Sequence, residues 1–309
     1  MSGLELEGRR LRLKNLDKVL WPAASFTKGD LIAFYRDIAP ALLPHLAARP
    51  VTLRRFPDGI DGLGWYQTQC RGCPEWMRTQ PLRGRGGALL RYCRVDDVPS
   101  LVWTASVGTI ELHPFLALGD RPHEPTVLVF DLDPGPPADI LDCCRIAIRL
   151  RDLLHELHLG SFAKTSGSVG LHVYVPLNTP HSYEQTKAFA RALAARLAAE
   201  RPEEVVDRMQ RTLRAGKVLI DWLQNDASRS TVAPYSLRAT PWPTVSTPVA
   251  WAEVEGALAA RRPELLTFDA RDVRQRLDRL GDLFRPVVEL RQALPADAGV
   301  CGAGRSQGR

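Results

Sequence analysis

Long hydrophobic runs are missing from this sequence of 309 residues. No stretch approaches the roughly 20 consecutive apolar residues that a membrane-spanning helix needs. The N-terminal stretch MSGLELEGRRLRLKN carries charged residues where a secretory signal peptide would have its apolar core. These absences predict a protein without a membrane partner, and we expect it in the cytoplasm.

Cysteine is also too sparse and too scattered, with six residues, for the disulfide framework of a small secreted protein. Cys143 and Cys144 are adjacent in an apolar stretch, and Cys93 is isolated. Cys70 and Cys73 form a lone CxxC pair without a second pair at the spacing of a zinc site. We therefore expect free thiols in this loop rather than a structural zinc ion.

An acidic excess is absent as well. Forty-one Lys and Arg outnumber 35 Asp and Glu, which gives a net charge of +6. The content of 45% hydrophobic and 25% charged residues is typical of a folded globular protein. The mild basic excess is compatible with a polyanionic partner such as nucleic acid, although it does not establish one.

The first half of the chain indicates an α/β start. Residues 28–46 have apolar residues at helical spacing after Thr27, a plausible cap, and residues 51–56 are typical of a strand. Residues 60–90 show little periodicity, which predicts surface loops.

The second half is more regular. In order, it predicts a strand at 126–133, a helix at 138–158, two strands within 162–177, a helix at 182–200 and a strand at 217–223. This β-α-β-β-α-β order resembles the split ferredoxin-like unit, in which helices cover one face of an antiparallel sheet and the other face is left for a substrate.

Two aspartates end the strand TVLVFDLD. Asp131 and Asp133 are two residues apart, so both side chains point to the same face. Such close like charges favour a cation between them, and oxygen ligands suit Mg²⁺ or Mn²⁺. On its own, this motif more often marks a charged turn at the end of a strand.

Asp221 lies within the apolar strand KVLIDWL, where an unpaired charge would be costly. In the ferredoxin-like order this strand can lie beside the one that carries Asp131 and Asp133. The three carboxylates could then hold two divalent ions. The alternative is an aspartate at a strand edge that faces solvent or an arginine.

A glycine-rich turn, KTSGSVGLH, spans residues 164–172. Its small residues allow backbone N–H groups to approach an anion such as a phosphate, although an ordinary hairpin turn would have a similar sequence. His172, just beyond the turn, could donate to phosphate. Arg238, in the extended segment 224–251, has a planar guanidinium that matches phosphate oxygens.

Several long motifs occur in the order found in the polymerase domain of bacterial ligase D, in the archaeo-eukaryotic primase superfamily. They are NLDKVLWP, FTKGD, RPVTLRRFPDG, VFDLDPG, KTSGSVGLHVYVPL, DWLQN, STVAPYSLRA and VSTPVAW. The chain resembles this family over nearly its whole length. The resemblance implies an α+β fold: a primase-polymerase core with a ferredoxin- or RRM-like antiparallel sheet, plus an N-terminal α/β subdomain. We expect this domain at residues 10–290, divided into subdomains at about 10–120 and 121–290, and a flexible tail at 291–309.

The resemblance also implies a function: a DNA-repair nucleotidyltransferase that adds NTP or dNTP to a primer 3′-hydroxyl at gaps or double-strand breaks. The implied cofactor is a pair of Mn²⁺ or Mg²⁺ ions, held by Asp131, Asp133 and Asp221. The incoming triphosphate would contact Ser166, Ser168, His172, Arg238, Arg54 and His113. A downstream 5′-phosphate would be gripped by Asn15, Lys18 and Lys28. Template bases would stack on Trp65 and Tyr66.

The sequence departs from the family at Val169, where the usual SGSKG motif has a lysine. This predicts weaker triphosphate binding or an altered nucleotide preference, unless another cation substitutes. The Cys70–Cys73 motif is a second departure, for which we have no functional account.

The chain has no ligase lysine motif or nuclease module that we can identify. We therefore expect a stand-alone polymerase in a bacterial cytoplasm, associated with the nucleoid, that cooperates with a separate DNA ligase and with the end-binding protein Ku. Two other hypotheses remain: a metal-dependent nuclease that uses the same aspartates, and a non-catalytic module that bridges DNA ends.

Overall fold

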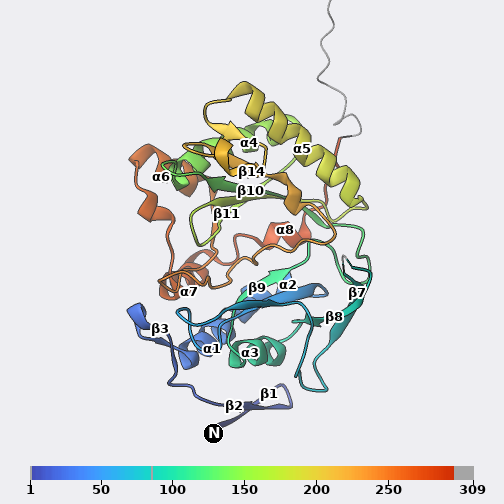
Figure 1. The fold of residues 1–309 in the computed structure, drawn as a ribbon, viewed down its shortest axis with the longest axis vertical. Helices are drawn as coiled ribbons and strands as arrows, with labels where there is room; N and C mark the ends of the chain where they lie inside the picture. Colours follow the sequence, from blue (N-terminus) through green and yellow to red (C-terminus); the bar gives the residue numbers. More distant parts are fainter. Residues whose placement is uncertain (1, 85, 296–309) are drawn as a thin grey trace, which may run out of the picture.

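The computed structural model describes residues 2–84 and 86–295, which form two lobes packed against each other (Figure 1). We call the part before residue 125 the N-terminal lobe and the part from residue 125 onward the C-terminal lobe. Each lobe has a sheet and a large hydrophobic core. In the described part of the chain, no helix is long and apolar enough to cross a membrane.

The N-terminal lobe is built on a five-stranded sheet with strand order β6-β5-β8-β7, in which β9 also pairs with β5. Its elements are β1 (Ser2–Leu6), β2 (Arg9–Leu13), β3 (Val19–Trp21), η1 (Pro22–Ala24), β4 (Phe26–Thr27), α1 (Lys28–Asp37), α2 (Ala39–Leu46), β5 (Pro50–Arg55), β6 (Trp65–Gln67), β7 (Thr79–Arg83), β8 (Leu89–Arg94), α3 (Val98–Ser106) and β9 (Thr109–Pro114).

The helical stretch expected after Thr27 is confirmed, with Thr27 as the cap of α1, whereas the loops expected at residues 60–90 were wrong. Residues 28–46 form two helices, because Pro40 in the first turn of α2 has no N–H with which to continue α1. Residues 60–90 contain β6, β7 and the start of β8. Side chains on β6 and β7 are half-buried or exposed, so these strands leave no apolar alternation in the sequence.

The expectation of free thiols was wrong for Cys70, which forms a disulfide with Cys93. The amide of Cys70 donates a hydrogen bond to the carbonyl of Arg91, which holds the loop alongside β8. The two cysteines are 23 residues apart, and only the tertiary fold brings their Cα atoms to 4.8 Å. Cys73, Cys143 and Cys144 are free.

The C-terminal lobe has a six-stranded sheet with strand order β13-β14-β10-β12-β11-β15, antiparallel except between β13 and β14. Its elements are β10 (Val127–Pro134), α4 (Ile140–Glu156), β11 (Phe162–Thr165), β12 (Leu171–Pro176), α5 (Tyr183–Glu200), β13 (Val205–Val206), η2 (Arg211–Leu213), β14 (Val218–Asp221), η3 (Trp222–Gln224), β15 (Pro248–Val249), α6 (Trp251–Ala260), η4 (Pro263–Leu266), α7 (Ala270–Leu280) and α8 (Arg285–Glu289). The inner order β14-β10-β12-β11 is that of the ferredoxin-like unit, which confirms the predicted core.

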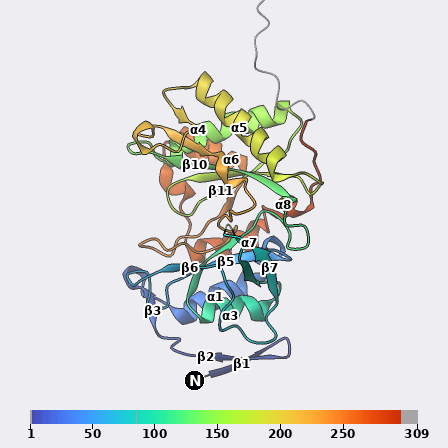
Figure 2. The same ribbon diagram turned by 45° about the vertical axis from the view of Figure 1, so that its right-hand side comes forward.

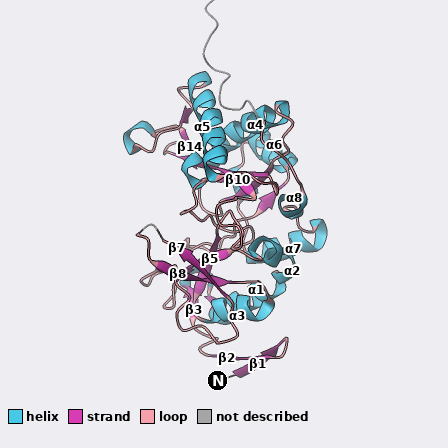
Figure 3. Cartoon of the chain, turned by 90° about the vertical axis from the view of Figure 1, so that its right-hand side faces the viewer, coloured by secondary structure: helices cyan, strands magenta, loops and turns pink. Residues whose placement is uncertain are grey.

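The two faces of this sheet have different roles. Leu128, Phe130 and Leu132 on β10 pack into the core that also contains residues of α4 and α5. Asp131 and Asp133 alternate with them and therefore face away from these helices. The turned views in Figure 2 and Figure 3 keep α4 and α5 on the far side of the sheet from the N-terminal lobe.

The chain also returns to the N-terminal lobe after β14. Ala233, Tyr235, Leu237 and Val245 are buried in the core of that lobe. The cores are thus shared across the expected boundary near residue 120, which remains a prediction. The expected tail at residues 291–309 falls largely outside the described part of the chain, which ends at residue 295.

Candidate active site

Three aspartates meet at the centre of the C-terminal sheet. Strands β10 and β14 pair in a register that sets Asp131 directly opposite Asp221, and Asp133 lies two residues further along the same face. The predicted proximity of the two strands is confirmed. Asp221 Oδ1 caps the turn that follows by accepting a hydrogen bond of 2.9 Å from the amide of Leu223.

Gln224 lies between two of these carboxylates. Its Nε2 donates to Asp221 Oδ2 at 3.1 Å and to Asp131 Oδ2 at 3.5 Å. The amide therefore occupies the space between two strands that each carry negative charge. A cation that binds there would take over the contacts of this one neutral donor.

The charges of the three aspartates are incompletely balanced. Burial, together with the charges of Asp131 and Asp221, raises the pKa of Asp133 to about 7. Burial and the charge of Asp131 also raise the pKa of Asp221. Burial opposes the ionisation of Asp131 too, but His172, Lys164 and Arg238 outweigh it and lower its pKa. The cluster is therefore electrostatically suited to positive charge.

His172 and Lys164 form a buried layer beside Asp131. His172 Nε2 lies 3.1 Å from Asp131 Oδ1, and its ring stacks on Tyr174. Lys164 Nζ donates to Ser246 Oγ at 2.6 Å. Burial lowers the pKa of His172 and lowers that of Lys164 well below its ordinary value. These groups fix Asp131 from behind.

The donor set fits a hard divalent cation. The oxygens of Asp131, Asp133 and Asp221 are the ligand type that Mg²⁺ and Mn²⁺ prefer, and the buried Asp131 Oδ1 has His172 Nε2 beside it at 3.1 Å. The carboxylates are not closed around one point, since no group of three or more His, Cys, Asp or Glu in the described residues is arranged to hold a metal. Gln224, which contacts both Asp131 and Asp221, is the neutral side chain that a bound cation would displace.

The turn between β11 and β12 forms the next wall. Ser166 Oγ accepts hydrogen bonds from the amides of Ser168 at 3.1 Å and Gly170 at 3.0 Å, so those amides are already paired. The hydroxyl proton of Ser166 remains as a donor. Gly167 has φ +72°, and a Cβ there would lie 2.7 Å from the amide nitrogen of Ser246. Only glycine fits this close approach.

Opposite the aspartates lies a basic cluster from three segments. Arg238 Nη1 donates to the carbonyl of Ser166 at 2.5 Å and its Nε lies 3.3 Å from Glu111 Oε1. Arg54 Nη1 donates to the same Glu111 oxygen at 2.7 Å. His113 Nε2 lies 2.8 Å from Glu111 Oε2, and its ring meets that of Tyr66 edge-on.

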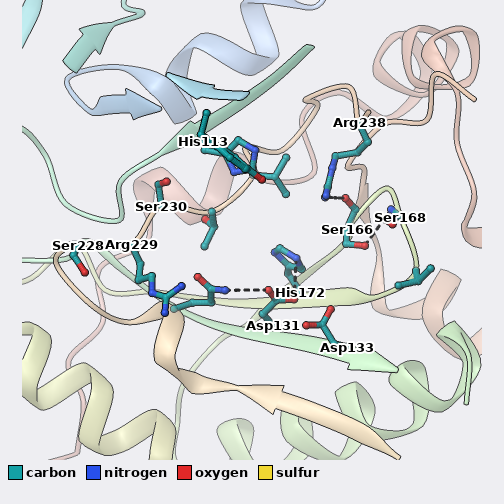
Figure 4. Close-up of a pocket in the computed structure, with 15 residues that line it drawn as sticks. His113, Asp131, Asp133, Ser166, Ser168, His172, Ser228, Arg229, Ser230 and Arg238 are labelled. Atoms are coloured by element: carbon teal, nitrogen blue, oxygen red, sulfur yellow. Dashed lines mark hydrogen bonds and ion pairs between the residues drawn. The ribbon is translucent and has the colours of Figure 1, made fainter. Parts of the chain in front are cut away.

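Both clusters open into one cavity of about 420 Å³. Eight of the residues predicted from the sequence as site residues line it: Tyr66, His113, Asp131, Asp133, Ser166, Ser168, His172 and Arg238. Figure 4 shows Asp131 and Asp133 on one side and His113 and Arg238 across from them. Val169, 61% exposed, also lines the cavity, where the family motif would place a lysine.

Two predicted residues lie just behind the lining. Asp221 contacts the cavity through Gln224, and Arg54 lies beneath Tyr66 with its guanidinium 5.4 Å from that ring centre. Trp65 stays outside the cavity, half-exposed, with the guanidinium of Arg55 5.3 Å from its ring centre. Tyr66 is thus the better placed of the two aromatic residues to meet a base in the cavity.

A second hollow, of about 510 Å³, lies on the N-terminal lobe. Asn15 and Lys28 line it together with Arg10, Arg12 and Lys14. Lys18 is not part of this lining and pairs with Asp58 at 2.5 Å. Burial and the charges of Lys18 and Arg55 lower the pKa of Lys28, so Lys18 is nonetheless close enough to add to the positive field.

Sequence reasoning missed several residues of the main site, four of which carry charge or polar contacts that the site uses. These four are Glu111, Lys164, Gln224 and Arg229. Glu111 could have been found, because it is a carboxylate in the buried strand TIELHP, two residues before His113 and on the same face. Arg229, exposed in a serine-rich loop, carried no such signal.

Comparison with known proteins agrees with this geometry. A family model described as LigD, primase-polymerase domain matches residues 27–284. The chain is 39% identical over 283 residues to the multifunctional non-homologous end joining protein LigD of Mycolicibacterium smegmatis, covering 90% of this chain and 36% of that protein. It is 38% identical over 301 residues to the corresponding DNA repair protein of Mycobacterium tuberculosis H37Rv, covering 94% of this chain and 38% of that protein.

A solved structure described as the polymerase domain from Mycobacterium tuberculosis ligase D in complex with DNA superposes with a TM-score of 0.84. The two are 35% identical, and the match covers 92% of this chain and 99% of that one. The chain therefore belongs to the LigD primase-polymerase domain family, and it spans little more than a third of the length of the curated relatives it matches.

Proposed function

We propose that this protein is a template-directed nucleotidyltransferase that adds NTP or dNTP to a primer 3′-hydroxyl at gaps or broken ends of DNA. The observation that carries the proposal is one cavity lined by Asp131 and Asp133 on one side and by Arg238 and His113 on the other, with Asp221 and Arg54 just behind the lining. A nucleoside triphosphate needs cations at its phosphates and fixed donors around them, and this cavity offers sites for both.

In this proposal Asp131, Asp133 and Asp221 hold two Mn²⁺ or Mg²⁺ ions. When bound, such ions make a hydroxyl more acidic and neutralise charge on transferring phosphates. Arg238 and the hydroxyl of Ser166 orient the triphosphate, with Ser168 and His172 bordering it and Arg54 supporting it from behind Tyr66. The reaction needs positioning and charge stabilisation, so no protein nucleophile is assigned.

The hollow near Asn15 and Lys28 would bind a downstream 5′-phosphate, with Lys18 adding to its positive field. Such contacts position DNA without reading its sequence. Relatives are named for non-homologous end joining, which supports a role in that pathway. A DNA ligase and Ku are the partners proposed for it.

Primer extension on a gapped duplex with a labelled primer tests the proposal. We expect extension that requires both nucleotide and Mn²⁺ and that falls at least about 100-fold in Asp131→Asn with Asp133→Asn. Asp152→Asn, which alters an exposed aspartate on α4, is the matched control and should extend normally.

Two outcomes would replace the proposal. Shortening of the primer in Mn²⁺ without nucleotide would indicate a nuclease. DNA-end bridging without any extension, unchanged in the double variant, would indicate a binding module. Running ribo- and deoxyribonucleotides in parallel on gapped, blunt and overhanging DNA also defines the preferred substrate.

A further inference from the structure

Glu111 is a buried carboxylate at the centre of the basic cluster. It lies on β9, where every residue is buried, and its side chain is 1% exposed. Glutamate is rarely buried to this extent unless it is paired, because an isolated carboxylate in the interior is strongly destabilising. Its partners should therefore explain why it is there.

Four groups lie against this carboxylate, three as hydrogen-bond donors and Arg238 as an ion pair. Oε1 accepts from Arg54 Nη1 at 2.7 Å and from the amide of Ala239 at 2.9 Å, and it lies 3.3 Å from Arg238 Nε. Oε2 lies 2.8 Å from His113 Nε2. Glu111 does not line the cavity itself, whereas His113 and Arg238 do.

The contact with His113 fixes which ring nitrogen carries a proton. Burial lowers the pKa of His113 and outweighs the hydrogen bond and the charge of Glu111, which raise it, while Arg238 and Arg54 lower it further; the neutral ring is therefore favoured. A neutral ring that donates from Nε2 to Glu111 has Nδ1 as its acceptor. His113 is then an acceptor held in place, not a cation for phosphate.

The contact with Arg238 has a second consequence. Arg238 is close enough to Asp131 and Asp133 to lower the pKa of both. Without a carboxylate of its own, its guanidinium would be drawn to the aspartates, whose charges are incompletely balanced. Glu111 and the carbonyl of Ser166 hold it on the opposite wall.

We propose that Glu111 is a positioning residue: it keeps Arg238 on the cavity wall that meets the triphosphate and away from the aspartates, it holds Arg54 behind Tyr66, and it fixes the Nε2-protonated form of His113. This inference rests on the proposed function and deepens it. The two arginines against one carboxylate leave positive charge for the phosphates, while the aspartates stay open for cations.

The test compares Glu111→Gln, Glu111→Asp and Glu253→Gln. Glutamine keeps the size of the side chain but removes its charge, and aspartate keeps the charge. Glu253 binds Arg276 through both oxygens at 2.6 and 2.8 Å, away from the cavity, so it is a matched carboxylate–arginine control. We expect Glu111→Gln to raise the nucleotide KM roughly 10- to 100-fold with kcat changed far less, Glu111→Asp to recover most of the loss, and Glu253→Gln to leave KM unchanged.

Nitrogen-15 NMR of the histidine rings supplies a readout that does not depend on activity. We expect His113 of the parent protein to be neutral and protonated at Nε2 at pH 7.5, and we expect Glu111→Gln to weaken this preference for Nε2, because a neutral amide replaces the carboxylate that only accepts. An Nδ1-protonated or doubly protonated ring in the parent would overturn the inference, and so would a Glu111→Gln variant with the parent's KM. If the parent extends no primer, the proposed function fails, and the ring measurement still decides the role of Glu111.

Discussion

Two clusters of buried charge face the same cavity and are built in opposite ways. Around Asp131, Asp133 and Asp221 burial and mutual repulsion are not fully offset by the nearby cations, and the pKa of Asp133 rises to about 7. Around Glu111 burial would raise the pKa in the same way, but bonds from His113, the charge of Arg238 and the amide of Ala239 lower it to about 2. The aspartate cluster thus has negative charge that its neighbours do not balance, and the Glu111 cluster has more positive than negative charge. Divalent cations with a triphosphate would complete both.

The largest effect on nucleotide binding should come from removing Arg238, the main cation of the basic cluster. We expect Arg238→Ala to raise the nucleotide KM about 100-fold, because it removes charge-assisted bonds to phosphate. Arg276→Ala, which breaks a comparable pair with Glu253, is the control. Steady-state extension kinetics measure both variants, and an unchanged KM in Arg238→Ala would break the assignment of this wall to the triphosphate.

Relieving repulsion on the acidic side should stabilise the metal-free protein. The pKa of Asp133 is about 7 in the folded protein and about 4 in the unfolded chain. Between pH 4 and pH 7, Asp133 therefore holds a proton in the folded state that it has lost in the unfolded state. Stability contributed by the protonated form is complete below pH 4 and is lost as pH rises to 7. We expect Asp133→Asn to raise the free energy of unfolding at pH 8 by about 2 kcal/mol and to change it little at pH 4.

Urea denaturation in EDTA at the two pH values measures this difference. Asp152→Asn, at an exposed position, should match the parent at both. Equal stability of parent and Asp133→Asn at pH 8 would mean that the aspartates are already neutralised by their neighbours.

The second hollow should affect the choice of DNA rather than nucleotide. We expect Lys18→Ala with Lys28→Ala to remove a preference of about 10-fold for a 5′-phosphorylated gap, since each lysine contributes a phosphate contact or field. Lys217→Ala, on the C-terminal lobe, is the control. Extension on gaps with and without the phosphate gives the ratio, and a ratio equal to that of the parent would show that the hollow does not sense the phosphate.

Val169 should give the smallest effect. It is exposed at the edge of the cavity, so Val169→Lys adds a solvated cation near the triphosphate, which we expect to lower the nucleotide KM a few-fold. Val169→Gln separates length from charge. If lysine and glutamine give the same KM as valine, Arg238 and its neighbours already supply the needed charge.

The acidic side was largely predictable from strand alternation and strand order, whereas Arg54 and His113 of the basic side came only from the family resemblance and Glu111 was missed. Asp131 and Asp133 are set by strand alternation, and Asp221 follows once the order of the ferredoxin-like unit places β14 beside β10. Arg54 and Arg238 are 184 residues apart in the sequence, from position 54 to position 238. They meet at Glu111 only because the chain returns to the N-terminal lobe after β14. The Cys70–Cys93 disulfide was missed for the same reason: no local pattern encodes a contact made by the fold.

Calorimetric titration of Mn²⁺ into the protein tests most directly whether the aspartate side of the cavity is the side that binds the cations. The account predicts that the parent and Asp152→Asn bind Mn²⁺ alike, and that Asp131→Asn with Asp133→Asn loses this binding. A double variant that binds Mn²⁺ as tightly as the parent would contradict the assignment of the cations to the three aspartates.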